Sequence, residues 1–255
     1  MPSFPIGSFY SGLSGLQLDI PQYQFPAPFQ NASRLTYYAS LFNSLECNSS
    51  FYKIPRPATI ARWADAVNDH FKFTFKLWRE ITHSKPFNFK SEDVALFFNA
   101  INEVREKKGC LLIQFPPSLD IHHIHQLRKL LDVIKDVNIT QEWKIAVEFR
   151  HKSWYHESVY ELLDMYKASV VIHDIPKSAT PLLDQVADFI YIRFHGPTGN
   201  YRGSYSPEHL NEYAAYIHEW MEEGKTVFVY FNNTMGEAIN NLRSLNSFLN
   251  EKIDT

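Results

Sequence analysis

Short runs rich in β-branched and aromatic residues alternate along this sequence with longer runs of helical period. The strand-like runs are residues 10–14, 44–48, 71–78, 110–115, 145–150, 169–174, 189–195 and 227–232. Helical period is clear in residues 35–42, 92–107, 124–137, 159–166, 210–221 and 238–249. Parallel strands need a long crossover, usually a helix, so this alternation predicts a parallel sheet. Eight such units in 255 residues favour closure into a (β/α)8 barrel, a TIM barrel, over an open doubly wound sheet.

The chain is expected to form a single α/β domain over residues 1–255. Its composition, 45% hydrophobic and 21% charged, is typical of a globular protein, and no Gly/Ser linker, low-complexity tract or charge block divides it. The two cysteines, Cys47 and Cys110, lie inside apolar strand-like runs. We therefore expect them to be small core residues rather than a disulfide or a metal pair.

Side-chain parity within the strand-like runs predicts where polar groups meet. In residues 145–150, Ile145, Val147 and Phe149 share one face, whereas Glu148 and Arg150 share the other. The apolar face is expected to pack on the helices, and the inward face turns polar only at its C-terminal end. Other runs repeat this pattern, and burying such groups separately would be costly. They are expected to converge at the barrel mouth, where TIM barrels carry their sites.

The polar residues assigned to this mouth come from the ends of seven runs. They are Glu46, Asn48, Lys76, Gln114, Glu148, Arg150, Asp174, Arg193, His195, Tyr230 and Asn232.

Several short motifs occur in a fixed order along the chain. They are GLSG at 12–15, ECNSSFY at 46–52, FK at 75–76 with TH at 82–83, QFPPS at 114–118, VEFRH at 147–151 with SW at 153–154, RFHG at 193–196 and YFNNT at 230–234. Together they resemble the YecE-like family, a bacterial domain of unknown function, over nearly the whole chain. The resemblance implies a TIM barrel with a polar mouth, and it implies no reaction. Leu13 and Leu16 depart from the family's usual Thr and Trp, which leaves Ser14 as the contact expected from the first strand.

Our main functional hypothesis is an enzyme acting on a small polar or phosphorylated substrate, such as a sugar or nucleotide. Lys76, Arg150 and Arg193 supply the cations that recognise a carboxylate or phosphate, with amide neighbours to complete the contacts. Glu46 and Glu148 would then act as a general acid and base and His195 as a proton shuttle, in a hydrolase, lyase or isomerase. The alternative for the same residues is a structural ion-pair network that closes the top of the barrel.

Two further classes stay open at this point. Glu148, Asp174 and His195 are possible ligands for a divalent metal such as Mg, Mn or Zn. A metal there would suit a phosphoester hydrolase acting on nucleic acid. Arg150 and Arg193, however, would repel the ion. No other cofactor is expected. A non-catalytic module that binds nucleic acid or a metabolite is the third class. The net charge of −3 and a pI of about 6.4 argue against a nucleic-acid partner.

The sequence also predicts some features of the surroundings of the site. Phe51, Tyr52 and Tyr201 are among the aromatic residues that follow strand ends and are candidates for stacking on a ligand ring. The polar loop 196–206 is a candidate lid. Residues 1–10 lack the pattern of a signal peptide and no run is long enough to span a bilayer, so the cytoplasm is expected and no membrane partner. The substrate and the oligomeric state are not readable from the sequence.

Overall fold

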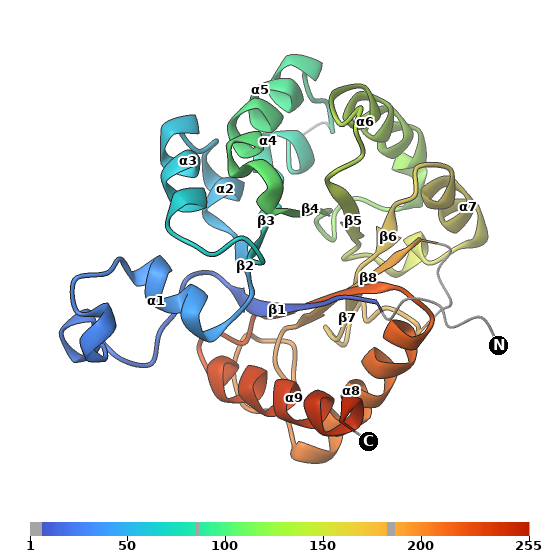
Figure 1. Ribbon diagram of the computed structural model, residues 1–255. Coiled ribbons are helices and arrows are strands. Elements are labelled where there is room, and N and C mark those ends of the chain that lie inside the picture. Colours follow the sequence, from blue (N-terminus) through green and yellow to red (C-terminus); the bar gives the residue numbers. More distant parts are fainter. Residues whose placement is uncertain (1–6, 85–86, 183–186, 255) are drawn as a thin grey trace.

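The computed structural model describes residues 7–84, 87–182 and 187–254 (Figure 1). The first six residues of the segment 1–10, discussed above for the absence of a signal peptide, lie outside this range. The strands are β1 (Phe9–Ser14), β2 (Ser44–Cys47), β3 (Lys72–Lys76), β4 (Lys108–Gln114), β5 (Lys144–Glu148), β6 (Ser169–Val170), β7 (Ile172–His173), β8 (Phe189–Phe194) and β9 (Thr226–Phe231). All eight expected strands are confirmed, and the sixth is divided in two at Val171.

The parallel strands form one sheet in the order β6-β5-β4-β3-β2-β1-β9-β8-β7. The first and last strands in that order, β6 and β7, follow each other directly in the sequence. β6 pairs with β5, and β7 pairs with β8. Between the halves, the Val171 amide still donates to the Val147 carbonyl at 2.9 Å, whereas His173 is in register with Arg193. The sheet is therefore a nearly closed barrel, and Figure 1 shows the helices arranged around it. The predicted α/β barrel is confirmed.

The helices around the barrel are α1 (Arg34–Leu41), α2 (Ser49–Tyr52), α3 (Pro57–Asp65), α4 (Arg79–Thr82), α5 (Ser91–Ile101), α6 (Ile124–Val137), α7 (Glu157–Met165), α8 (Pro207–Glu222) and α9 (Ala238–Ile253). Short 3-10 turns are η1 (Gln22–Gln24), η2 (Ala27–Phe29), η3 (Asn102–Lys107), η4 (Ile121–His123) and η5 (Lys152–Trp154). The six expected helices are confirmed, although the one expected at 92–107 ends at Ile101 and continues as η3.

Local sequence explains where several helices begin and which face they bury. Ser33 and Ser206 precede α1 and α8, and each side chain accepts a hydrogen bond from a backbone amide of the first turn. In α6, Leu127, Leu130 and other apolar residues at helical spacing are buried against the barrel. Our prediction missed α3, whose first residue is a proline, a residue favoured at that position.

Two apolar layers lie on the two faces of the sheet. Phe73, Val147 and their neighbours point outward into the layer beneath the helices. A smaller cluster that includes Phe189 and Phe228 fills the barrel interior. Cys47 belongs to the outer layer and Cys110 to the inner one, and both are buried free thiols, as expected. The inward/outward parity of the strands is therefore confirmed, and the inward polar residues lie above the inner apolar cluster.

The strands pack closely at one level of the barrel. A Cβ atom at Gly12 of β1 would lie 2.0 Å from the Ser44 carbonyl oxygen of β2, so this position requires glycine. In the described part of the chain, no helix has the length and apolar character needed to cross a membrane.

Candidate functional site

Arg193 of β8 lies at the centre of the polar cluster and joins two carboxylates from other strands. Its Nη2 donates to Glu46 Oε1 of β2 at 2.6 Å, and its Nη1 donates to Glu148 Oε2 of β5 at 2.6 Å. The Tyr191 hydroxyl donates to the second oxygen of Glu46 at 2.6 Å. The side chains of the two glutamates are 0% exposed and that of Arg193 is 1% exposed. The three form a buried ion network across the barrel.

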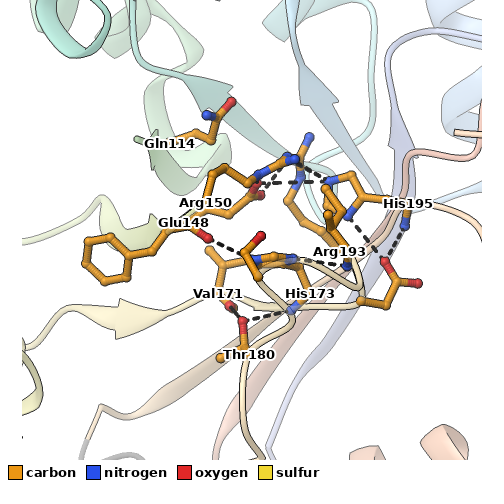
Figure 2. A network of polar contacts seen from close by, with 12 residues as sticks. Gln114, Glu148, Arg150, Val171, His173, Thr180, Arg193 and His195 are labelled. Carbon is orange, nitrogen blue, oxygen red and sulfur yellow. Dashed lines mark hydrogen bonds and ion pairs between the residues drawn. The ribbon is translucent and has the colours of Figure 1, made fainter. Parts of the chain in front are cut away.

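A second arginine extends this network toward the mouth (Figure 2). Arg150, just beyond the end of β5, donates from Nε to the other oxygen of Glu148. His195 Nε2 lies 3.1 Å from Arg150 Nη2 and 3.2 Å from Arg193 Nη1. Because guanidinium groups only donate, this ring nitrogen accepts, and the proton of a neutral imidazole must be on Nδ1. That atom faces Asp174 Oδ1 at 3.4 Å.

The network fixes the charge state of its members. Burial alone would raise the pKa of Glu148, but the charges of Arg150 and Arg193 outweigh burial and hold that pKa well below its usual value. In the same way, Arg193 outweighs burial at Glu46 and lowers the pKa of that carboxyl. Burial lowers the pKa of His195 to about 4. At neutral pH both glutamates are therefore ionised and His195 is neutral.

A pocket of about 190 Å³ lies at the mouth, at the C-terminal end of the strands. It is lined by Asn48, Phe51, Tyr52, Lys76, Arg150, Arg193, Tyr201 and Asn232. Five of these residues belong to the set assigned to the mouth from the sequence, and the other three are among the aromatic residues expected to accompany it. The strand ends thus converge as parity predicts.

The other predicted site residues lie outside the lining of this pocket. Glu46, Glu148 and His195 have no exposed surface. Asp174 accepts hydrogen bonds from the His195 amide at 2.8 Å and from the Tyr205 hydroxyl. These contacts make Asp174 a support for the network.

Gln114 and Tyr230 also have roles other than lining the pocket. Gln114 Oε1 accepts from Lys76 at 2.8 Å and so orients that ammonium. Tyr230, which we expected at the mouth, points into the barrel below it, where its hydroxyl bonds to Ser44 Oγ at 2.6 Å and Thr74 Oγ1 at 2.8 Å. Parity gives the inward direction of Tyr230 but not its depth, which the stagger of the strands sets.

Lys76 at the end of β3 differs from the two arginines because it has no acidic partner. Among the described residues, no carboxylate lies within ion-pair distance of its ammonium. Its contacts are Gln114 and the face of Phe51, whose ring centroid is 4.1 Å from Nζ. Burial, reinforced by the charge of Arg193, lowers the pKa of Lys76 to about 8.

Buried polar atoms without a partner mark the same pocket. Asn48 Oδ1 and Arg193 Nε are buried and make no hydrogen bond within the described structure. Both residues line the pocket. Such atoms are rare in folded proteins and call for an explanation, of which a bound ligand or water is the simplest.

The loop 196–206 carries Tyr201 into the pocket wall. Tyr201 has a left-handed backbone, with φ 66°, a conformation that is costly for a bulky residue. Hydrogen bonds hold it there, from its amide to the His195 carbonyl at 2.7 Å and from the Met235 amide to its carbonyl at 3.0 Å. The Gly196 amide also donates to the Tyr205 hydroxyl. These bonds hold the loop in the position in which Tyr201 lines the pocket, and the role of the loop as a lid stays a prediction.

Sequence reasoning missed two residues that support the site, Tyr191 and His173. Tyr191 shares the inward parity of Arg193, and that signal was available. His173 lies in register with Arg193, and its Nε2 is 2.9 Å from the Phe149 carbonyl oxygen. Val170 and Ile172 lie in the outer apolar layer and Val171 in the inner one, so the inward parity of Val171 is shared by His173 and not by Asp174. Tyr205, one of the aromatic residues expected to accompany the site, contacts Asp174 from a loop.

The metal site that we considered does not fit this geometry. In residues 7–84, 87–182 and 187–254, no group of three His, Cys, Asp or Glu side chains is arranged to hold a metal ion. Of the expected ligands, Glu148 accepts from two arginines, and His195 Nε2 faces the same two guanidinium groups. A dication at this place would have to displace two cations.

Comparison with known proteins agrees with the fold and with the expected family resemblance. The model of a family described as "Protein of unknown function DUF72" matches residues 10–255. The protein YunF of Bacillus subtilis is 27% identical over 244 residues, which cover 83% of this chain and 84% of the relative. YecE of Escherichia coli strain K12 is 25% identical over 141 residues, 55% of this chain and 50% of YecE.

Solved structures of similar proteins have the same architecture. The crystal structure of a DUF72 family protein from Thermotoga maritima superimposes with a TM-score of 0.77 at 25% identity, covering 97% of this chain and 100% of the other. A DUF72 family protein from Enterococcus faecalis gives a TM-score of 0.76 at 23% identity, covering 96% and 98%.

Proposed function

Because this chain belongs to DUF72, a family of unknown function, its activity has to be inferred from the site, and we propose that the barrel mouth is the active site of an enzyme for a small anionic metabolite. The ligand would carry a carboxylate or phosphate group. The pocket volume of about 190 Å³ suits a small molecule or the charged end of a larger one.

The observation that carries this proposal is the uncompensated charge of Lys76. Three cations reach the pocket wall, and the two nearest carboxylates are already bound by the arginines. One positive charge is therefore left for a ligand. A desolvated ammonium is costly without a partner, and a bound anion would supply that partner.

Arg150 adds directional recognition to this charge. Its Nε and Nη2 are used within the network, and no hydrogen-bond partner is described for its Nη1. The side chains of Asn48 and Asn232 line the same pocket and can complete the contacts to a planar carboxylate or to phosphate oxygens. The rings of Phe51, Tyr52 and Tyr201 offer an apolar wall for the rest of the ligand.

In this proposal Glu46 and Glu148 are positioning residues rather than an acid/base pair. Each is buried, ionised and bound by arginine, so neither has a proton to give. His195 accepts from both guanidinium groups, which occupies the lone pair that a proton shuttle would need. The network holds Arg150 and Arg193 in place for the anion.

Binding of simple anions tests this proposal. Acetate and inorganic phosphate are titrated into the protein by isothermal calorimetry, with acetamide as the neutral counterpart of acetate. We expect both anions to bind and acetamide not to bind. Lys76→Met is expected to weaken anion binding about tenfold or more, since charge-assisted hydrogen bonds contribute roughly 1.5–3 kcal/mol.

The matched control is Lys144→Met, which removes a lysine from the N-terminal end of β5, at the opposite end of the barrel. Lys144 pairs with Asp188 at the surface, and its loss should leave anion binding unchanged. Equal affinity of acetate for the wild-type protein and Lys76→Met would refute the assignment, as would the absence of any anion binding.

A further inference from the structure

The environment of Lys76 is that expected of a reactive amine as well as that of an anion-binding residue. Its side chain packs over Phe51, and its only described polar partner is the Gln114 amide oxygen, which stabilises an ammonium less than a carboxylate does. Lysines become nucleophiles when they are desolvated or placed next to another cation, because both effects favour the neutral amine. Both conditions hold here.

Burial is the largest cause of the lowered pKa, and the neighbouring charges act in both directions. Arg193 and Arg150 oppose protonation of Lys76, whereas Glu148 and Glu46 favour it, each by less than burial opposes it. With a pKa of about 8, roughly a tenth of the molecules carry a free amine at pH 7. For an ordinary lysine that fraction is more than a hundred times smaller.

The histidine beside Phe51 does not compete for the role. His83 contacts the edge of the Phe51 ring, with 4.9 Å between ring centroids, and its Nδ1 lies 2.7 Å from Thr82 Oγ1. Burial and the charge of Lys76 lower the pKa of His83 to about 4. The histidine is therefore neutral and adds no positive charge next to the amine.

We propose that Lys76 forms a Schiff base with a small oxo acid whose carboxylate is bound by Arg150. This inference rests on the proposed function and adds the substrate class and the nucleophile. Arg150 and Lys76 line one pocket, so a ligand held by its carboxylate presents a neighbouring carbonyl carbon to the amine.

The chemistry balances without any further reactant. The Lys76 lone pair forms a C–N bond to the carbonyl carbon, and the C=O π electrons move to the oxygen, which takes up a proton. The nitrogen, which has become positively charged in the addition, gives up one of its two protons, and the product is a neutral carbinolamine. A second protonation of the oxygen lets it leave as water while the nitrogen lone pair forms the C=N bond of an iminium, which keeps one N–H. Counted from the protonated lysine, one ammonium and one carbonyl give one iminium and one water.

The iminium carries the same positive charge as the ammonium that it replaces. The electrostatic balance with Arg150, Arg193 and the two glutamates is therefore unchanged, and the network does not have to rearrange. An iminium withdraws electrons from the adjacent carbon, which is the usual use of such a group in C–C or C–H bond cleavage.

Reductive trapping tests this inference. The protein is incubated with glyoxylate and cyanoborohydride, which reduces the iminium to a carboxymethyl amine, and the modified lysines are located by peptide mass spectrometry. We expect modification at Lys76 to be about tenfold or more faster than at Lys144, to saturate with glyoxylate and to be blocked by acetate. Acetaldehyde, which lacks the carboxylate, should show no such preference.

Lys76→Arg removes the nucleophile, because it keeps the positive charge and cannot form an iminium. It should lose the preferred adduct, whereas Lys144→Arg should retain it. If acetate binds through Lys76 but Lys76 is trapped no faster than Lys144, the Schiff base is refuted and the proposed function stands. If neither acetate binding nor trapping depends on Lys76, both proposals fail.

Discussion

Replacing Arg193 by methionine tests whether the buried network holds the barrel mouth together. Arg193 bonds to Glu46 and Glu148 at 2.6 Å each, and all three side chains are at most 1% exposed. After the substitution Glu148 still has Arg150, but Glu46 keeps only neutral hydroxyl donors, chiefly that of Tyr191. Breaking a buried pair from one side leaves an uncompensated charge and typically costs about 3–5 kcal/mol.

Urea unfolding measures this loss as a change in the free energy of unfolding. The control is Arg243→Met, which removes an arginine that pairs with Asp19 at 2.9 Å on the surface, with both side chains more than 40% exposed. That pair should contribute at most about 1 kcal/mol. If the two variants lose equal stability, the central role given to Arg193 is wrong.

The pH dependence of the same variant gives a second test. In the wild-type protein the pKa of Glu46 lies below its ordinary value, so its stabilising effect is present above the unfolded pKa and is lost as the pH falls through the folded one. Without Arg193, burial, the largest effect on Glu46, is opposed only by hydrogen bonds from neutral hydroxyls, so we expect that pKa to rise above its ordinary value and the sign to reverse. The stability deficit of Arg193→Met should therefore shrink between pH 7 and pH 5. The double variant with Glu46→Gln should be more stable at pH 7 than Arg193→Met.

Two further substitutions separate the pocket from its support. Tyr230→Phe removes a hydroxyl bonded to Ser44 and Thr74 below the pocket, so it should cost about 0.5–1.5 kcal/mol in urea unfolding and leave acetate affinity unchanged. A change in acetate affinity would place Tyr230 in the binding site after all. Lys76→Met removes a desolvated ammonium that has no described acidic partner, so we expect it to leave the thermal unfolding temperature unchanged or to raise it. A clear loss of stability would mean that Lys76 is a structural residue.

The sequence predicts the barrel and the polar layer because both follow from periodicity. The strand parity of residues 145–150 already places Glu148 inward and Phe149 outward, and the structure agrees. What parity cannot give is depth, which depends on the stagger between strands. For that reason Tyr230 and Lys76 have the same inward direction, and one lies below the pocket while the other lines it.

The sequence also could not predict which charged side chains of the site bind one another. Counting charges at the mouth gave three carboxylates and three cations, a set that looks neutral. In the structure Asp174 accepts from Tyr205 and from the His195 amide, and it lies outside the lining of the pocket. The site itself thus retains a positive charge, which favours the anion binding and the amine nucleophile that we propose over carboxylate acid/base catalysis.

The structural and functional interpretations of the polar cluster are therefore compatible. A closed ion network satisfies Glu46 and Glu148 beneath the mouth, and such a network could in principle be replaced by apolar residues at little cost in stability. Retaining it makes physical sense if it fixes two guanidinium groups beside Lys76, where they lower the pKa of the amine and present donors to an anion. The ion pairs that stabilise the top of the barrel would then also set the reactivity of Lys76, the cation that they leave unpaired in the described part of the mouth.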